Sequence, residues 1–374
     1  MKTYQLIATC AAGIESLVNQ ELKDMGYHTQ TENGRVLFEG TMEDIAKTNM
    51  WLRTADRIKI LIGQFKAHSF EMLFDKVYQL EWEDYIPMDG EFPVAGKSIK
   101  SKLHSVPNVQ RITKKAISKK LMDHYHRRAN LPETGALFPL EVAIRKDIAE
   151  LTLDTTGSSL FKRGYRVDKG AAPLKENMAA ALVKLTTWHP DRPLYDPTCG
   201  SGTILIEAAL IGHNIAPGLY RDFAFQDWPW FPKTILEQVR QEAKAQMDLD
   251  KTLNIYGSDI DHRMIDIAQE NAQNAGVAHS IQFKQMQLAD FVPNEEYGIL
   301  ISNPPYGDRM LTEEQVHEIY QDMGRIYRPM TTWSKYILTS DENFEEHYGE
   351  KATKKRKLYN GALKVDYYQY WGSK

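Results

Sequence analysis

Short apolar runs broken by turn signals fill the first part of the chain. A strand and a helix are predicted in YQLIATCAAGIESLVNQELKDMG, and a hairpin in TENGRVLFEG turns at Asn33 and Gly34. A second helix and the strand DRIKILIG follow. This mixture predicts a small α+β module, which we bound at residues 1–64.

From about residue 170 the pattern changes to a regular alternation of buried strands and amphipathic helices. Strand, glycine-rich turn and helix are predicted in RPLYDPTCGSGTILIEAALIG, and strand, acidic turn and helix in LNIYGSDIDHRMIDIAQENAQNAG. The strands SIQFK, ILIS and KYILTS and a terminal hairpin complete the series. The alternation predicts an α/β domain with a doubly wound, largely parallel sheet over residues 161–374. Residues 213–252 lengthen the first crossover and are interpreted as an insertion.

The segment between these two parts, residues 65–160, has divided charge. Seven acids and one lysine lie between Ser69 and Glu91, whereas ten Lys or Arg and one Asp lie between Ala95 and Asn130. The basic half contains a helix, VQRITKKAISKKL, with a buried stripe expected at Val109, Ile112, Ala116, Ile117 and Leu121. The same helix turns four cations toward solvent: Arg111, Lys114, Lys115 and Lys119. Such a face is typical of phosphate binding, although a solvated helix face has the same composition.

Composition limits the other possibilities. The chain of 374 residues is 42% hydrophobic and 26% charged with a net charge of −4, so any attraction to nucleic acid must be local. The two cysteines, Cys10 and Cys199, have no metal-ligand spacing, so no metal site is predicted, and they fit a reducing cytoplasm. The apolar run at the N-terminus is too short for a signal peptide, and no segment is long enough for a membrane span.

Three acids follow three successive predicted strands. Asp196 lies in a turn where it would repel a pyrophosphate but would suit an ammonium group, and Gly200 and Gly202 let a ligand approach the helix N-terminus. Asp259 is placed to accept two ribose hydroxyls, and Asp290 could accept from an adenine amine. A ligand with ammonium, ribose and adenine but no phosphate describes S-adenosylmethionine. Each acid alone could instead be a helix N-cap.

A fourth strand, ILIS, runs into Asn303, Pro304, Pro305 and Tyr306. Prolines cannot continue a strand ladder and hold the preceding residues extended, so a stiff loop is predicted there. Such a loop would hold the Asn303 side-chain amide and the Pro304 carbonyl in place, next to the Tyr306 ring. An ordinary chain reversal remains the simpler interpretation of this loop taken alone.

In this order, DPTCGSGT, GSDID, LADF and NPPYG resemble class I methyltransferases that act on exocyclic amines. Over nearly the whole chain, the sequence resembles one subgroup, the THUMP-domain 23S rRNA guanine-N2 methyltransferases. The segments that carry this resemblance are RGYR, APLKENMAAALV, LRTADR, HSVPNVQRITKKAI and LYNGALKVDYY. The resemblance implies a ferredoxin-like module at 1–64, a THUMP RNA-binding domain at 65–160 and a Rossmann-like catalytic domain at 161–374.

The resemblance also assigns roles. It puts Asp196, Gly200 and Gly202 at the methionine end of the donor, Asp259 at the ribose and Asp290 at the adenine, with residues 303–306 at the target base. The best-known bacterial enzyme of this kind carries a second methyltransferase domain behind the first. This chain ends at Lys374, so a second methylation activity is not expected here. Three alternatives remain open: adenine-N6 methylation of DNA or RNA, methylation of a release-factor glutamine, and a non-catalytic RNA-binding module with a vestigial methyltransferase domain.

Overall fold

The computed structural model describes residues 1–167, 174–305 and 311–373. The chain divides into two compact units. The first, which we call the N-terminal unit, consists of Met1–Cys10, Asn19–Leu160 and Arg221–Glu242. The second consists of Ala11–Val18, Phe161–Tyr220 and Ala243–Lys374, and we call it the catalytic unit after the domain expected at residues 161–374. Each is described here by itself.

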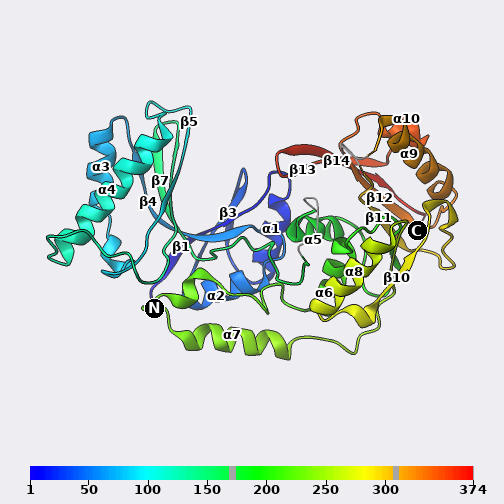
Figure 1. The fold of residues 1–374 in the computed structure, drawn as a ribbon, viewed down its shortest axis with the longest axis horizontal. Coiled ribbons are helices and arrows are strands. Elements are labelled where there is room, and N and C mark those ends of the chain that lie inside the picture. Colours follow the sequence, from blue (N-terminus) through cyan, green and yellow to red (C-terminus); the bar gives the residue numbers. More distant parts are fainter. Residues whose placement is uncertain (168–173, 306–310, 374) are drawn as a thin grey trace. The chain divides into compact units, whose positions relative to one another are not determined.

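The N-terminal unit is built on one seven-stranded sheet with the order β2-β3-β1-β4-β7-β6-β5 (Figure 1). Its elements are β1 (Tyr4–Thr9), α1 (Glu15–Asp24, shared with the catalytic unit), β2 (Thr29–Glu32), β3 (Arg35–Gly40), α2 (Met42–Trp51), β4 (Arg57–Lys66), α3 (Phe70–Tyr78), β5 (Val94–Ile99), α4 (Val106–His124), β6 (Leu140–Arg145) and β7 (Ile148–Asp154). The hairpin predicted to turn at Asn33 and Gly34 is the β2–β3 pair.

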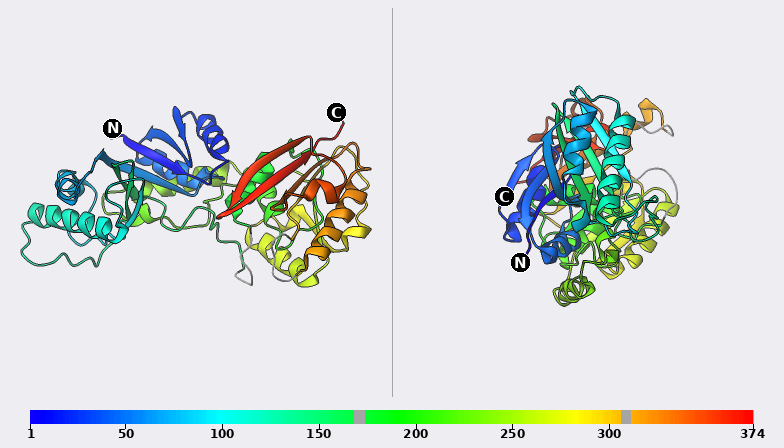
Figure 2. Two further views of the ribbon diagram at one scale, coloured as in Figure 1. Left: turned by 90° about the horizontal axis from the view of Figure 1, so that it is seen from above. Right: turned by 90° about the vertical axis from the view of Figure 1, so that its left-hand side faces the viewer.

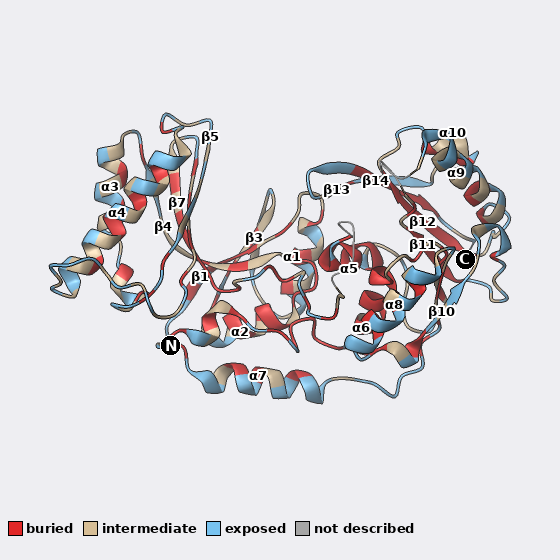
Figure 3. Cartoon of the chain, in the orientation of Figure 1, coloured by how far each residue is buried: buried red, intermediate tan, exposed pale blue. Residues whose placement is uncertain are grey.

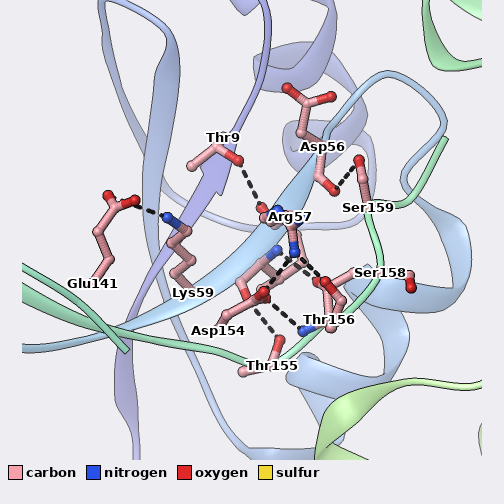
Figure 4. A network of polar contacts seen from close by, with 12 residues as sticks. Thr9, Asp56, Arg57, Lys59, Glu141, Asp154, Thr155, Thr156, Ser158 and Ser159 are labelled. Carbon is pink, nitrogen blue, oxygen red and sulfur yellow. Dashed lines mark hydrogen bonds and ion pairs between the residues drawn. The ribbon is translucent and has the colours of Figure 1, made fainter. Parts of the chain in front are cut away.

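Strand β4 joins the two halves of this sheet. It pairs with β1 on one side and with β7 on the other, both antiparallel. A polar network fixes the junction (Figure 4). The Arg57 guanidinium donates to Asp154 at 2.6 Å and to the carbonyl of Gly157, while Lys59 lies 3.4 Å from Glu141. Burial raises the pKa of Asp154, and the Arg57 cation opposes that rise. The modules expected at residues 1–64 and 65–160 therefore share one sheet.

Helix α4 lies beside α3 and packs on the β5 end of the sheet (Figures 1 and 2). Val109, Ala116, Ile117 and Leu121 are buried, as predicted, but Thr113 takes the place of Ile112 in the buried stripe. Ile112 is only partly buried. The helical spacing of the buried stripe was predicted correctly, but at this one turn the buried position is one residue later than predicted.

The catalytic unit contains a second seven-stranded sheet with the order β10-β9-β8-β11-β12-β14-β13. Strands β8 to β12 are parallel, and β14 is antiparallel to β12. The β13–β14 hairpin forms one edge (Figure 2). The elements are α5 (Glu176–Lys184), β8 (Leu194–Asp196), α6 (Thr203–Gly212), β9 (Ile255–Asp259), α8 (His262–Asn274), β10 (Ile281–Gln285), β11 (Ile299–Ser302), α9 (Glu313–Tyr327), β12 (Ser334–Thr339), α10 (Phe344–Tyr348), β13 (Lys354–Asn360) and β14 (Leu363–Tyr370).

Burial in this unit follows the strand pattern. Every residue of β11 and β12 is buried, and so are most residues of α5 and α6 (Figure 3). Strands covered on both faces read as continuous apolar runs, which is why ILIS was recognisable in the sequence.

The long first crossover divides between the two units. Residues 221–242 pack with the N-terminal unit, including most of α7 (Lys233–Ala245). Trp228 stacks on Phe138 with ring centroids 5.1 Å apart, and its indole donates to the carbonyl of Leu137 at 2.8 Å. The Trp230 indole donates to the carbonyl of Tyr85 at 2.8 Å. This part of the crossover is therefore a structural component of the N-terminal unit. No helix in the described ranges is both long and apolar enough to cross a membrane.

Candidate functional site

The carboxyl ends of β8, β9 and β11 bring three of the predicted residues to one edge of the sheet. Asp196 ends β8 and Asp259 ends β9, while Asn303 follows β11. Strand β8 lies between β9 and β11, so the strand order reverses there. In open parallel sheets, ligands bind outside the carboxyl ends of the strands at such a reversal.

The turn after β8 is fixed by the carboxylate of β9. Asp259 accepts from the Gly200 N–H at 3.0 Å and from the Asp261 N–H at 2.9 Å. Gly200 and Gly202 have φ values of +50° and +81°, which glycine adopts without strain. A Cβ at Gly202 would lie 3.1 Å from the Cβ of Ala268. At Gly200 it would meet only a methionine methyl group at 3.9 Å, so the space beside this turn is open to a ligand.

Asp196 is the most perturbed acid of the site. It is 2% exposed, and burial together with the nearby Asp259 carboxylate raises the pKa of Asp196 to about 8. The Thr198 N–H donates to the Asp196 carboxylate at 3.1 Å and opposes this rise. The buried Thr198 hydroxyl also lowers the pKa of Asp196, against the effect of burial. A cation brought to this place would favour the ionised carboxylate.

Asp290 occupies a different environment. It ends the 3₁₀ turn Leu288–Asp290 that follows β10, and it is exposed. Its backbone N–H donates to the carbonyl of Gln287 at 3.0 Å, which holds the turn. The assignment of Asp290 to an adenine amine stays a prediction.

An arginine that the motif analysis did not single out also holds the turn after β8, residues 197–202, which we call the donor-site turn. The Arg166 guanidinium donates to Glu176, to the hydroxyls of Ser201 and Thr203, and to the carbonyl of Leu174 at 2.8–3.2 Å. It thereby joins the segment before α5 to the start of α6. The only signal in the sequence was the RGYR motif, which by itself gives no partner.

Asn271 of α8 supports the same turn. Its side-chain oxygen accepts from the Val167 N–H at 2.8 Å and its amide donates to the Ser201 carbonyl at 3.1 Å. Asn271 is 1% exposed, so both contacts are shielded from water. A polar residue on the buried face of a helix was the sequence feature that marked it.

The loop after β11 begins with an unsatisfied acceptor. Asn303 Oδ1 is inaccessible to solvent and has no hydrogen-bond partner in the described part of the chain. The residues around it are well tied: Ser302 is hydrogen-bonded to the Tyr327 hydroxyl at 3.1 Å, and the Tyr320 hydroxyl reaches the Pro305 carbonyl at 3.5 Å. Tyr306 lies outside the described residues. A buried acceptor without a partner is costly, and such groups are concentrated at functional sites.

The four predicted RNA-binding cations on α4 are not equivalent. Arg111 and Lys115 are exposed. Lys119 is exposed but lies 2.6 Å from Asp123. Lys114 donates to Glu133 at 2.6 Å and to the Phe92 carbonyl at 2.8 Å, so its charge is largely used within the N-terminal unit.

The strand order and the donor-site turn together define a class I methyltransferase domain. Residues 163–369 match the family model described as "RMKL-like, methyltransferase domain". Residues 5–59 match "RlmL ferredoxin-like domain" and residues 67–154 match "THUMP domain". The chain therefore belongs to the RlmKL-like methyltransferase family, as the sequence motifs predicted, and its methyl donor is S-adenosylmethionine.

Relatives cover the chain over its whole length. It is 54% identical over 372 residues to "Putative RNA methyltransferase YpsC" of Bacillus subtilis, covering 99% of this chain and 97% of that protein. It is 33% identical to "Ribosomal RNA large subunit methyltransferase K/L" of Shewanella baltica, covering 95% of this chain and 51% of that protein. The crystal structure titled "SMU.472, a putative methyltransferase complexed with SAH" is 55% identical with a TM-score of 0.95, covering 100% of this chain and 99% of that one.

A further solved structure carries a different name. A "predicted N6-adenine-specific DNA methylase" of Listeria monocytogenes is 56% identical with a TM-score of 0.95, covering 100% of this chain and 97% of that one. The relatives thus agree on the reaction class and differ in the base and nucleic acid that their names state.

Proposed function

We propose that the protein transfers a methyl group from S-adenosylmethionine to an exocyclic base amine of ribosomal RNA, most specifically guanine N2 of 23S rRNA. The observation that carries the proposal is the buried, unpartnered Asn303 Oδ1 beside the donor-site turn. A target amine would satisfy this oxygen. The THUMP match at residues 67–154 and the relatives named as RNA methyltransferases support RNA as the substrate. Because the substrate is ribosomal, we expect the protein in the cytoplasm.

The residues present fit the donor. Asp259 already accepts two backbone N–H groups and fixes the turn on which the donor would lie, and Asp196 offers a carboxylate for an ammonium group. The donor supplies an electrophilic methyl group. This chain's part is to orient the donor and hold it away from water, so that attack can occur in line.

Asn303 and Pro304 act on the target. The lone pair of an aromatic amine is delocalised into the ring, which makes the nitrogen a poor nucleophile. Accepting both of its hydrogens, at the Asn303 oxygen and the Pro304 carbonyl, draws the nitrogen toward the tetrahedral geometry of attack. Tyr306 would stack on the base, which a paired target would have to flip out of its helix.

Parallel transfer assays test this function. Ribosomal RNA, duplex DNA and release factor are each incubated with labelled donor, and the methylated product is identified by digestion. We expect label in 23S rRNA as N2-methylguanine. N6-methyladenine in either nucleic acid would favour the alternative that the Listeria structure's name suggests. Donor binding without transfer to any of the three substrates would refute the catalytic proposal.

The RNA-binding face of α4 is tested by salt dependence. Replacing Arg111 and Lys115 with alanine removes two exposed cations, so the log–log salt slope of RNA binding should fall by about 0.7–0.9 for each. Lys47→Ala is the matched control, because this lysine of the same unit is already paired with Glu43 at 3.0 Å. An unchanged slope in the double variant would mean that α4 is only a solvated face.

A further inference from the structure

Two histidines and an aspartate that are distant in the sequence come together in the catalytic unit. His317 lies on α9, His347 on α10, and Asp341 in the turn after β12. Their candidate ligand atoms all lie within 4.8 Å of one another. All three residues are partly buried, so the cluster is shielded from bulk water on some sides and open on others.

The distance between His317 and Asp341 is close to that between two ligands of one ion. Ligand atoms at 2.0–2.1 Å from a tetrahedral ion lie about 3.3 Å apart. His317 Nε2 is 3.4 Å from Asp341 Oδ2 and 3.9 Å from Glu313 Oε1. Glu313 lies one helical turn before His317 on α9 and could supply a further oxygen.

His347 must turn to complete the set. Its ring stacks on that of His317 with centroids 3.7 Å apart and planes 17° from parallel. The nitrogen lone pairs of stacked rings lie in nearly parallel planes and cannot converge on one ion, so one ring has to rotate about its Cβ–Cγ bond. This torsion is broad and inexpensive for histidine.

We propose that His317, Asp341 and His347 form a binding site for a divalent transition-metal ion, of which Zn²⁺ is the best match. Two imidazoles and one carboxylate favour zinc and its neighbours over Mg²⁺ and Ca²⁺, which prefer oxygen ligands alone. The sequence predicted no metal, because ligand spacing along the chain was the criterion and these ligands come from separate elements.

The bound ion would stabilise the residues that hold the loop beginning at Asn303. The Asp341 N–H donates to the Thr339 hydroxyl at 3.1 Å, and this hydroxyl is hydrogen-bonded to that of Tyr320 at 2.7 Å. The Tyr320 hydroxyl in turn reaches the Pro305 carbonyl. An ion held by His317, Asp341 and His347 would join α9 and α10 to the end of β12, on which this chain of contacts rests. Its role is structural, and methyl transfer does not pass through it.

The test uses the full chain, free of any affinity tag and stripped of metal. Zn²⁺ is titrated by calorimetry, and Co²⁺ absorption reports the geometry of the ligands. We expect one ion per chain and a higher Tm in its presence. His317→Ala, His347→Ala and Asp341→Asn should each weaken binding about tenfold or more. His189→Ala is the control, because His189 also lies near an aspartate, Asp191 at 3.8 Å, but without a second histidine.

Circular dichroism and donor affinity show whether each variant is folded. If wild-type protein takes up neither ion, the site does not exist. If all three folded variants bind as tightly as wild type, the ion lies elsewhere. Either result overturns the proposal, and neither bears on methyl transfer, which is measured separately.

Discussion

Replacing Asn303 with alanine should separate activity from stability. Most buried asparagines stabilise a fold through hydrogen bonds, but Asn303 Oδ1 is buried with no partner in the described residues. Its desolvation, about 1–3 kcal/mol, is therefore not recovered in the free protein. Alanine relieves that cost and loses a similar amount of packing, so the free energy of unfolding should change by less than about 1 kcal/mol.

Asn271→Ala provides the matched comparison. Asn271 is 1% exposed and has two partners, Val167 N–H at 2.8 Å and Ser201 carbonyl at 3.1 Å. Its loss leaves two polar groups unsatisfied and should cost about 2–4 kcal/mol. For a unit of this size each kcal/mol shifts Tm by about 2–4 °C, so the two variants are easily distinguished by thermal unfolding.

The activity of Asn303→Ala should fall although its stability is nearly unchanged. Turnover at saturating donor and RNA should fall by about 10²-fold or more, because one positioned acceptor of the transition state is lost. Donor affinity measured by calorimetry should be unchanged. A fall in Tm as large as that of Asn271→Ala, with turnover retained, would show that the Asn303 amide is structural and refute the reasoning.

Three further changes probe the donor site. Asp259→Ala should weaken donor binding by about 1–3 kcal/mol, or roughly 5- to 150-fold, in calorimetry, whereas Asp261→Ala, which removes only a helix cap, should leave affinity nearly intact. Because the pKa of Asp196 is raised from its ordinary value of 3.8 to about 8, its contribution to stability is fully present below the ordinary value and is lost as the pH rises from there through 8. Pairing with a donor ammonium requires the carboxylate, so donor binding at pH 7 should release a proton. Calorimetry in buffers of different ionisation enthalpy measures this release. Equal proton release by Asp196→Asn would contradict the prediction. Gly202→Ala should lower the Tm of the protein more than Gly276→Ala. Both glycines have φ near +80°, but only Gly202 has a close neighbour, at 3.1 Å. Equal losses of Tm would show that this contact is harmless.

The meeting of three candidate site residues at one edge of the sheet was predictable because they follow a local rule. Asp196, Asp259 and Asn303 each come directly after a buried apolar run, and parallel strands bring their carboxyl ends to one edge. Tyr306 was predicted by the same rule, but it lies outside the described residues.

What could not be predicted depends on contacts between distant parts of the chain. Nothing near Lys114 in the sequence indicates that Glu133 would take up its charge. The Trp228 and Trp230 pair marked an insertion, yet no periodicity indicates that it would pack beside Phe138 and Tyr85. The phase of α4 failed at Ile112 for the same reason, since the neighbouring helix and sheet decide which side of a helix is covered.

The division of the chain between the units has a consequence for biosynthesis. The catalytic unit includes both residues 11–18 and β13, which is synthesised more than 300 residues later. These segments meet where Arg356 donates to the Gly13 carbonyl at 3.0 Å. The earlier segment must therefore wait for a further 343 residues to be synthesised before Arg356 can reach it. A fragment limited to residues 163–369 would lack it altogether and expose the edge that it covers.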